Sequence, residues 1–390
     1  MALDKHLMKI GIITHWKDSD NYGAALQSYA LQKYLRDLGQ EAFVIRYYRK
    51  PQKVSYLKKI LHVLSHPMVL KNRRNNKEKL KKVPEWNKQR DFNSFRNKYI
   101  CYSESVYNGF EELQYNYPKA DIYITGSDQV WGVSLKNEQN RAFFLDFGKE
   151  DTVRVSYAAS FGHDYFPCEN EVLFKTLLSR FKDVSMREES GVELLKERGI
   201  DSIRCLDSTL LLPFENYKAL TSARKHSSPY VFFYTVNVAR PDEIYWKQIR
   251  DYLQQKGVKL IVTTGSGYLQ PEEMFDGAEY DYATVEEWLA NIVNAEFVVT
   301  ASFHGVVFSY LFKKSFIYMP LRAKSAKGNN RVIDFLKSVG LLNRLANNWE
   351  EVKRLVDEDI DYSMLNDKAF HELLIKSKRF LQGLLEEKSY

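Results

Sequence analysis

The chain has 390 residues, 44% of them hydrophobic, and a formal net charge of +7 at pH 7. A chain of this length exceeds the size at which one hydrophobic core keeps growing, so two domains are expected. The lack of any apolar run near ~20 residues excludes a membrane-spanning helix, and three widely spaced cysteines with no signal peptide in residues 1–9 exclude a disulfide-rich secreted protein.

Strand and helix patterns alternate through the first part of the chain. Residues 9–15 form an apolar run typical of a buried strand, residues 22–38 carry apolar side chains at helical spacing, and residues 42–47 predict a second strand. This unit has the length of a parallel crossover. Further strands are expected at 121–125, 153–159, 184–186 and 203–206, with helices at 171–181 and 189–198. Residues 1–224 therefore predict one doubly wound α/β domain.

One segment of the first domain makes the chain basic. Residues 46–98 hold 17 Lys and Arg against three acidic residues, which gives this segment a net charge of +14. The rest of the chain therefore has a net charge of −7. Residues 54–69 mix apolar and lysine side chains at helical spacing, and we expect residues 48–100 to form a basic helical insertion. Such a segment suits peripheral contact with an anionic membrane. A solvated insertion is the alternative, and nucleic acid is not expected as a partner because no recognised binding module surrounds the charge.

A second α/β set follows a polar stretch without periodicity at residues 221–229. Its strands are expected at 230–236, 259–264, 297–300 and 316–319, and its helices at 242–255, 285–294 and 305–312. We assign residues 225–365 to a second domain and residues 366–390 to a C-terminal helix. The fold class predicted is therefore α/β, with two Rossmann-like domains that face each other across a cleft.

His304 is the first candidate for catalysis. The apolar strand at 297–300 breaks into a polar turn and then a helix, and His304 stands at that junction. Open α/β sheets place ligands at such junctions, because helix N-terminal N–H groups face the crevice there. Imidazole gains and loses a proton near physiological pH, which suits acid or base catalysis. A histidine that only caps the helix or fills a domain boundary is the alternative.

Polar residues that suit a sugar follow two strands of the first domain. Asn21 precedes a helix that it can cap, and Gly23 lets a ligand or a backbone approach the first turn. Asp128, Gln129 and Trp131 follow another strand, and a carboxylate, an amide and an aromatic ring are typical of sites that hold sugar hydroxyls and cover a sugar face. Capping residues in ordinary turns would look similar.

Two arginines are candidates for anion binding. Arg187 stands at a strand end, where its guanidinium suits a phosphate or carboxylate, although a surface ion pair with Glu188 or Glu189 is equally open. Arg331 opens a helical stretch. Asp207 closes the last strand of the first domain, where capping is favoured over a cleft role. The chain has no zinc-type ligand set and no Walker loop, so neither a metal nor a nucleotide cofactor is expected.

Six motifs occur in the order found in the polysaccharide pyruvyl transferase family, which this chain resembles. They are N-Y-G-A-A-L-Q-S-Y-A-L-Q-K-Y-L (21–35), G-S-D-Q-V-W (126–131), S-Y-A-A-S-F-G (156–162), S-M-R-E-E-S-G (185–191), L-D-S-T-L-L-L (206–212) and S-F-H-G-V-V-F-S (302–309). The resemblance implies a glycosyltransferase-B-like arrangement of the two domains. It also implies transfer of pyruvate from phosphoenolpyruvate onto two hydroxyls of a sugar as a ketal, with no resident cofactor.

The resemblance also implies roles for single residues. His304 matches the family's catalytic histidine, and Arg187 matches an arginine that binds the donor. Some members carry an arginine near that histidine where this chain has Phe303, and we expect Arg331 to replace it. The helix start after Ser302 is expected to assist in holding the donor, so the second domain is the donor side.

The first domain is then expected to be the acceptor side. Asp128 is our candidate for the base that activates the sugar hydroxyls, and three further residues are predicted to bind the acceptor: Asn21, Gln129 and Trp131.

Two other functions stay open at this point. One is a nucleotide-sugar-dependent glycosyltransferase of the same architecture, with Glu286 or Glu287 as the ribose-binding acid. The other is a non-catalytic sugar-binding protein. The expected partners are phosphoenolpyruvate and a sugar acceptor, either in a polysaccharide or in a lipid-linked precursor. The expected location is the cytoplasm, with the inner face of the membrane as the place where a lipid-linked acceptor would be met.

Overall fold

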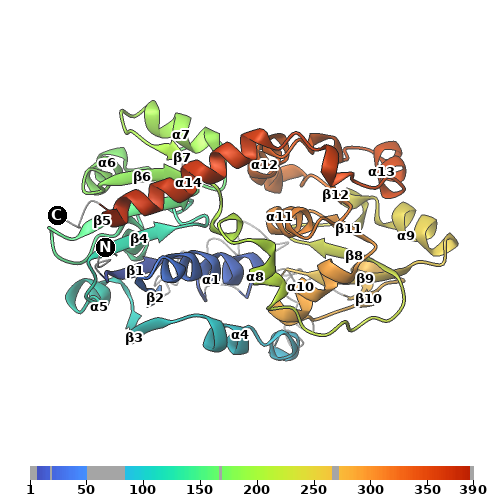
Figure 1. The fold of residues 1–390 in the computed structure, drawn as a ribbon, viewed down its shortest axis with the longest axis horizontal. Helices are drawn as coiled ribbons and strands as arrows, with labels where there is room; N and C mark the ends of the chain where they lie inside the picture. The colour runs from blue at the N-terminus through green and yellow to red at the C-terminus, as the bar shows by residue number, and fades with distance from the viewer. Residues whose placement is uncertain (1–6, 18–19, 51–83, 167–168, 266–271, 387–390) are drawn as a thin grey trace, which may run out of the picture.

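Two parallel β-sheets, each covered by helices, make up the protein (Figure 1). The structure is a computed structural model that describes residues 7–17, 20–50, 84–166, 169–265 and 272–386. The seven strands of the first sheet lie in the order β3-β2-β1-β4-β5-β6-β7, and the five strands of the second lie in the order β10-β9-β8-β11-β12.

The first sheet is formed by the apolar runs of the first part of the chain. Its strands are β1 (Lys9–Ile13), β2 (Glu41–Tyr48), β3 (Tyr102–Asn108), β4 (Ile122–Gly126), β5 (Val153–Ala159), β6 (Asp183–Met186) and β7 (Ile203–Arg204). Every pairing is parallel, as in the register Ile10 to Ile122 between β1 and β4. The central strands are buried along almost their whole length, because helices cover both faces of a parallel sheet and continuous apolar runs are then stable there.

The first half has helices at the three positions predicted for it, within a few residues, and further short helices that the sequence did not predict individually. They are α1 (Tyr22–Asp37), α4 (Phe92–Tyr99), α5 (Phe110–Tyr115), α6 (Glu171–Leu178), α7 (Glu189–Lys196) and α8 (Phe214–Lys218). Asn21 caps α1 by accepting a hydrogen bond from the Ala24 N–H at 3.2 Å. Gly39 lies just beyond the end of α1 at φ 85°, a conformation that glycine adopts without strain.

The second sheet has strands β8 (Tyr230–Thr235), β9 (Lys259–Thr264), β10 (Glu279–Tyr280), β11 (Phe297–Thr300) and β12 (Phe316–Tyr318). Its helices are α9 (Trp246–Gln255), α10 (Val285–Asn294), α11 (Phe303–Leu311), α12 (Asn330–Ser338) and α13 (Trp349–Val356). The predicted helix at 242–255 is in fact a 3-10 turn over Pro241–Ile244 followed by α9. The predicted domain boundary at residue 224 lies in the segment between β7 and β8.

The two halves are packed against each other through α1 and the last helix. Tyr22 of α1 is fully buried, stacks on Trp288 with a ring separation of 5.1 Å, and donates a hydrogen bond to the Ala283 carbonyl at 2.7 Å. Helix α14 (Lys368–Glu386) runs from the second half back over the first (Figure 1), where Ser377 accepts from the Leu206 N–H at 2.8 Å. The fold therefore brings strand ends of both sheets together.

Most of the basic insertion cannot be compared with its prediction, because residues 51–83 lie outside the described residues. The described end of the insertion is helical at residues 84–90 and in α4, after which the chain enters β3, a strand that the sequence did not predict. Among the described residues, no helix combines the length and the apolarity needed to cross a bilayer.

Candidate functional site

The predicted site residues lie at the carboxyl ends of parallel strands. Asp128 follows β4, Arg187 follows β6 and Asp207 follows β7, while His304 lies in the first turn of α11 directly after β11. In a parallel sheet these ends meet at one edge, where helix N-termini also point. The fold thus gathers three of these side chains from the first half and one from the second.

Arg187 lies at the centre of a buried group of carboxylates. Its Nη1 donates to Oδ2 of Asp207 at 3.0 Å, its Nε donates to Oε1 of Glu188 at 2.9 Å, and Oδ1 of Asp128 lies 3.8 Å from Nη1. The ion pair with Glu188, which was the alternative for Arg187, therefore forms, but the Arg187 side chain is only 3% exposed and the pair does not lie at the surface. Burial opposes the charge, but the three carboxylates raise the pKa of Arg187 above its ordinary value. We call these four residues the arginine-carboxylate cluster.

Asp207 caps its own turn, as the sequence favoured, and it also faces Arg187 and His304. Its Oδ1 accepts from the N–H of Thr209 at 3.0 Å and from the Thr209 hydroxyl at 2.7 Å, which caps the turn at Ser208–Leu210. Nε2 of His304 lies 3.8 Å from the same oxygen, and Arg187 binds the other one. Burial opposes ionisation, yet His304, Arg187 and the Thr209 N–H hold the pKa of Asp207 well below its ordinary range.

His304 reaches the first half of the protein through a gap left by Gly23. A Cβ at Gly23 would overlap the His304 ring, with Nδ1 as its nearest atom. Gly23 therefore allows the imidazole to lie directly on the first turn of α1. The His304 side chain is 11% exposed, and within the described part of the chain its Nε2 has no hydrogen-bond partner.

Phe303, the residue directly before His304, packs on Arg187. The guanidinium carbon of Arg187 lies 5.0 Å from the centre of the Phe303 ring, which is a cation-π distance. Ser302 precedes both residues as the N-cap of α11, but its side chain makes no capping hydrogen bond to the described residues. The start of α11 therefore keeps backbone N–H groups available near the cluster.

Arg331 also reaches the cluster, from the first turn of α12. With the amide of Gln129 turned so that its oxygen faces the guanidinium, Gln129 accepts hydrogen bonds from both Nη atoms of Arg331. Burial and the nearby charge of Arg187 lower the pKa of Arg331 from its ordinary value. The predicted acceptor ligand Gln129 and the predicted donor ligand Arg331 are thus direct neighbours.

Three nitrogen atoms in this region could still donate hydrogen bonds. Among the described residues, no partner is found for Nη2 of Arg187, Nε of Arg331 or Nε2 of His304, although all three atoms are buried. We call these atoms the open nitrogens. Buried polar atoms are normally paired, because an unpaired one costs about 1–3 kcal/mol. Oxygen atoms of an anionic ligand would satisfy all three.

The prediction for Trp131 is wrong. The indole is fully buried and stacks on Phe144 at 5.6 Å, and its Nε1 donates to the Phe143 carbonyl at 3.0 Å. It is a core residue of the first half and has no face to offer a sugar. Asn21 caps α1, as the alternative for it stated, and its contact with an acceptor remains a prediction.

Two residues of the site, Glu188 and Ser127, were not among the site residues predicted from the sequence. Glu188 joins the cluster and accepts from the Ser160 hydroxyl at 2.7 Å, which links the β6 end to the β5 end. The Ser127 carbonyl accepts from Nη1 of Arg187 at 3.4 Å, and the Gly126–Ser127 peptide bond is cis. The position of Glu188 directly after a predicted strand end was the signal that could have identified it.

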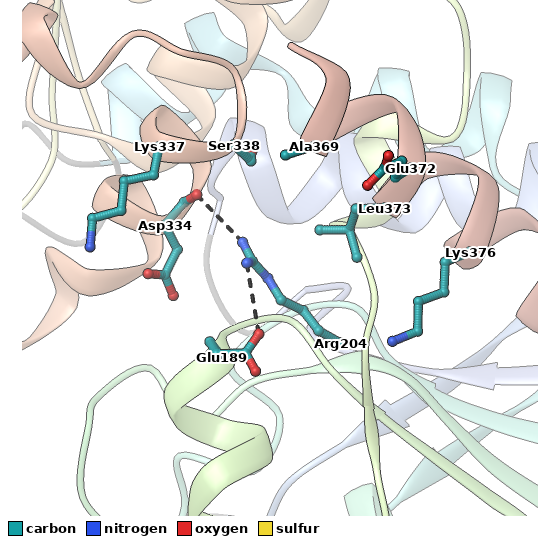
Figure 2. A pocket seen from close by; sticks show the side chains of 9 residues that line it. All are labelled: Glu189, Arg204, Asp334, Lys337, Ser338, Ala369, Glu372, Leu373 and Lys376. Atoms are coloured by element: carbon teal, nitrogen blue, oxygen red, sulfur yellow. Dashed lines mark hydrogen bonds and ion pairs between the residues drawn. The ribbon is translucent and has the colours of Figure 1, made fainter. Parts of the chain in front are cut away.

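A pocket of about 470 Å³ opens at the seam between the halves (Figure 2). It is lined by Glu189, Arg204, Asp334, Lys337, Ser338, Ala369, Glu372, Leu373 and Lys376. Arg204 crosses it and donates to the Asp334 carbonyl at 3.4 Å, with Glu189 at 3.8 Å. Three acidic and three basic residues balance in its walls. Among the described residues, no group of three or more His, Cys, Asp or Glu side chains is placed to hold a metal ion.

Comparison with known proteins adds a family and a fold. A family model described as polysaccharide pyruvyl transferase matches residues 21–321, well over half of the chain. No curated protein matches the chain in sequence.

Two solved structures are similar over nearly their whole length. UDP-N-acetylglucosamine 2-epimerase from Rickettsia bellii has a TM-score of 0.55 and 10% identity, with 97% of this chain and 96% of that one covered. The UDP-GlcNAc 2-epimerase of Methanocaldococcus jannaschii has a TM-score of 0.51 and 13% identity, with 97% and 99% covered. At such low identity the likeness concerns the fold alone, which is α/β and glycosyltransferase-B-like.

Proposed function

Because this chain belongs to the polysaccharide pyruvyl transferase family, we propose that it moves pyruvate from phosphoenolpyruvate onto two hydroxyls of one sugar and forms a ketal. The observation that supports this most is that the open nitrogens and the carboxylate of Asp128 occur together where strand ends of the two sheets meet. Anion-binding donors, a proton donor and a carboxylate base are the groups that such a reaction requires.

The donor would be held by the two arginines. Phosphoenolpyruvate carries a carboxylate and a phosphate on one small frame, so its site needs positive or N–H-rich groups at two points. Nη2 of Arg187 and Nε of Arg331 supply these points, and the N–H groups after Ser302 supply a third. Arg187 already faces three carboxylates, so an anionic donor also needs Arg331 as a second cation.

His304 would act as the general acid. Its imidazolium donates a proton to the methylene carbon of phosphoenolpyruvate, which becomes a methyl group, and the neighbouring carbon becomes electrophilic. The first sugar hydroxyl adds to that carbon and gives its proton to Asp128. The bond to phosphate breaks, the second hydroxyl attacks, and the ketal closes. Of the two hydroxyl protons, one balances the proton on the methyl group and the other leaves with phosphate. The reaction calls for no resident cofactor or metal.

The acceptor would lie on the side of the first half. Asp128 and Asn21 come from strand and helix ends of that half, and Gln129, the residue after Asp128, accepts hydrogen bonds from Arg331. Their amide and carboxylate groups suit sugar hydroxyls, which both donate and accept. The acceptor class is a sugar of a polysaccharide or of its lipid-linked precursor.

Membrane contact through the basic insertion is a separate part of the proposal, and it rests on the sequence. Residues 46–98 hold 17 Lys and Arg against three acids, and each cation near an anionic surface contributes up to about 1 kcal/mol. In liposome flotation we expect binding to anionic vesicles that high salt reverses. Equal flotation with neutral vesicles, or none with either, would contradict membrane contact.

The test of the catalytic proposal is phosphate release. We expect wild-type protein to release phosphate from phosphoenolpyruvate when a panel of saccharide acceptors is supplied, and His304→Gln to lower the rate by about 10³-fold. His226→Gln is the matched control, because His226 is also a buried histidine of the second half but lies beside Glu279 and Asp281. It should keep the wild-type rate.

Two other outcomes would replace the proposal. Nucleotide release from a nucleotide sugar, with phosphoenolpyruvate untouched, would establish a glycosyltransferase. Saccharide binding without turnover of either donor would establish a sugar-binding protein. Phosphate release that survives in His304→Gln would keep the reaction and remove His304 from it.

A further inference from the structure

We infer that Asp207 is a positioning residue that holds Arg187 and His304 in fixed relation across the seam between the two halves. The inference rests on the proposed function, because it assigns a task to Asp207 within that site. Its oxygens are divided between the two partners: Oδ2 accepts from Nη1 of Arg187 at 3.0 Å, and Oδ1 lies 3.8 Å from Nε2 of His304.

The carboxylate itself is held rigidly by its own turn. Thr209 donates to Oδ1 through both its N–H at 3.0 Å and its hydroxyl at 2.7 Å, and the Asp207 side chain is fully buried. Ser208 extends this anchor, because its N–H donates to the Ser127 hydroxyl at 2.9 Å in the turn after β4. A carboxylate fixed in this way can set the orientation of the groups that face it.

A purely structural role for Asp207 does not account for what surrounds it. A buried carboxylate needs hydrogen bonds and one positive partner, and Thr209 with Nη1 of Arg187 already provide these. Two open nitrogens nevertheless stay beside it within the described residues, Nη2 of Arg187 and Nε2 of His304. Asp207 therefore fixes one nitrogen of the guanidinium while another stays available to the ligand.

Arg187 and His304 would then act on different parts of the same donor molecule. Arg187 would bind an anionic group of the donor, and His304 would deliver the proton to a carbon of the same molecule. The angle and distance between these side chains decide whether the proton is delivered to that carbon, and small displacements of reacting groups cost about 10²-fold in rate. Because Arg187 comes from the first half and His304 from the second, a single carboxylate that faces both is the simplest means to fix that geometry.

The test uses Asp207→Asn, which keeps the size of the side chain and removes its charge. We expect kcat to fall on the order of 10²-fold, while the Kd for phosphoenolpyruvate measured by calorimetry rises less than about tenfold. Asp146→Asn is the matched control. Asp146 is a buried carboxylate that also bridges two arginines, Arg141 at 2.6 Å and Arg180 at 2.7 Å, but it lies near the start of β5 and away from the cluster. It should leave kcat unchanged.

A spectroscopic readout separates positioning from mere stability. In protein labelled with nitrogen-15 at histidine, the ring signals of His304, identified by their loss in His304→Gln, should shift in Asp207→Asn and stay in place in Asp146→Asn. Unchanged His304 signals in Asp207→Asn, or equal kcat in Asp207→Asn and wild type, would overturn the inference. If wild-type protein shows no turnover of phosphoenolpyruvate but the His304 signals shift as stated, the proposed function fails while the placement by Asp207 stands.

Discussion

The two edges of the first sheet each bury an arginine, and they do so in opposite ways. At the amino edge, Arg154 near the start of β5 donates to five backbone carbonyls, at distances from 2.8 to 3.3 Å. At the carboxyl edge, Arg187 after β6 faces the carboxylates of the arginine-carboxylate cluster. Both side chains are almost inaccessible to solvent.

The two arginines differ in the charge of their neighbours and in how completely their nitrogen atoms are paired within the described residues. Neutral carbonyls surround Arg154, and burial there lowers its pKa from the ordinary value, since little negative charge compensates. Burial has the same tendency at Arg187, but the neighbouring carboxylates outweigh it and raise that pKa. Arg187 also keeps one of the open nitrogens. The amino edge is therefore a closed structural unit, and the carboxyl edge has binding capacity left.

The largest expected effect comes from changing the two arginines in the same way. Arg187→Lys should lower phosphate release on the order of 10³-fold with a small change in stability, because the charge stays but the forked donor is lost. Arg154→Lys should lower the free energy of unfolding by roughly 3 kcal/mol, since several carbonyls lose their partner, and should keep the turnover of folded molecules. Steady-state kinetics and urea unfolding measure both. If Arg187→Lys and Arg154→Lys lowered phosphate release and the free energy of unfolding to the same extent, the two edges would not differ in the way described.

Gly23→Ala tests the close approach of the second half to the carboxyl edge. The new Cβ would overlap the His304 ring, so the imidazole must move away from the cluster and turnover should fall about 10²-fold. Gly383→Ala is the control, because a Cβ in that part of α14 meets no described atom within 4 Å. It should stabilise the helix by about 0.5–1 kcal/mol and leave the kinetics alone. An active Gly23→Ala variant would show that His304 need not lie on α1.

Arg331→Lys sharpens the comparison by testing the second cation of the carboxyl edge. A lysine keeps the charge but cannot reproduce Nε, so we expect KM for phosphoenolpyruvate to rise about tenfold with kcat little changed. Arg322→Lys serves as the control, since Arg322 is exposed and packs on Tyr245. An unchanged KM in Arg331→Lys would mean that Arg331 does not bind the donor.

The smallest effect concerns the pH dependence of stability. Because the pKa of Asp207 is lower in the folded protein than its ordinary value near 3.9, ionised Asp207 favours the folded state above that value, and this contribution is lost as the pH falls through the folded pKa. Unfolding free energies of wild type and Asp207→Asn should differ on the order of 2 kcal/mol at pH 6 and converge toward pH 2. A constant difference would mean that the charge of Asp207 does not stabilise the fold.

The parallel strands were predictable because continuous apolar runs leave few other structures open. β5, β9 and β11 match their predicted bounds. β3 was missed because its sequence, Y-S-E-S-V-Y-N, is largely polar and lies at the edge of the sheet, where one side meets solvent. The split between the 3-10 turn and α9 depends on Tyr245 at φ 52°, a local conformation that periodicity does not reveal.

The places of Arg187 and His304 in the fold could be predicted, because both residues come shortly after buried strands. Arg187 follows β6 of the first sheet and His304 follows β11 of the second, and the packing of the two halves brings these strand ends together. Trp131 lies further along its turn, where the direction of the side chain depends on packing against Phe144 that no spacing encodes. The double role of Asp207 was left open because it requires His304, a residue of the other half.

A crystal structure with bound phosphoenolpyruvate tests the central claim most directly. We predict that the donor's phosphate and carboxylate oxygens lie within hydrogen-bond distance of Nη2 of Arg187 and Nε of Arg331, with the methylene carbon next to Nε2 of His304. A donor bound instead in the pocket of Figure 2, against Arg204 and Lys337, with the open nitrogens unchanged, would contradict the assignment of the carboxyl edge as the active site.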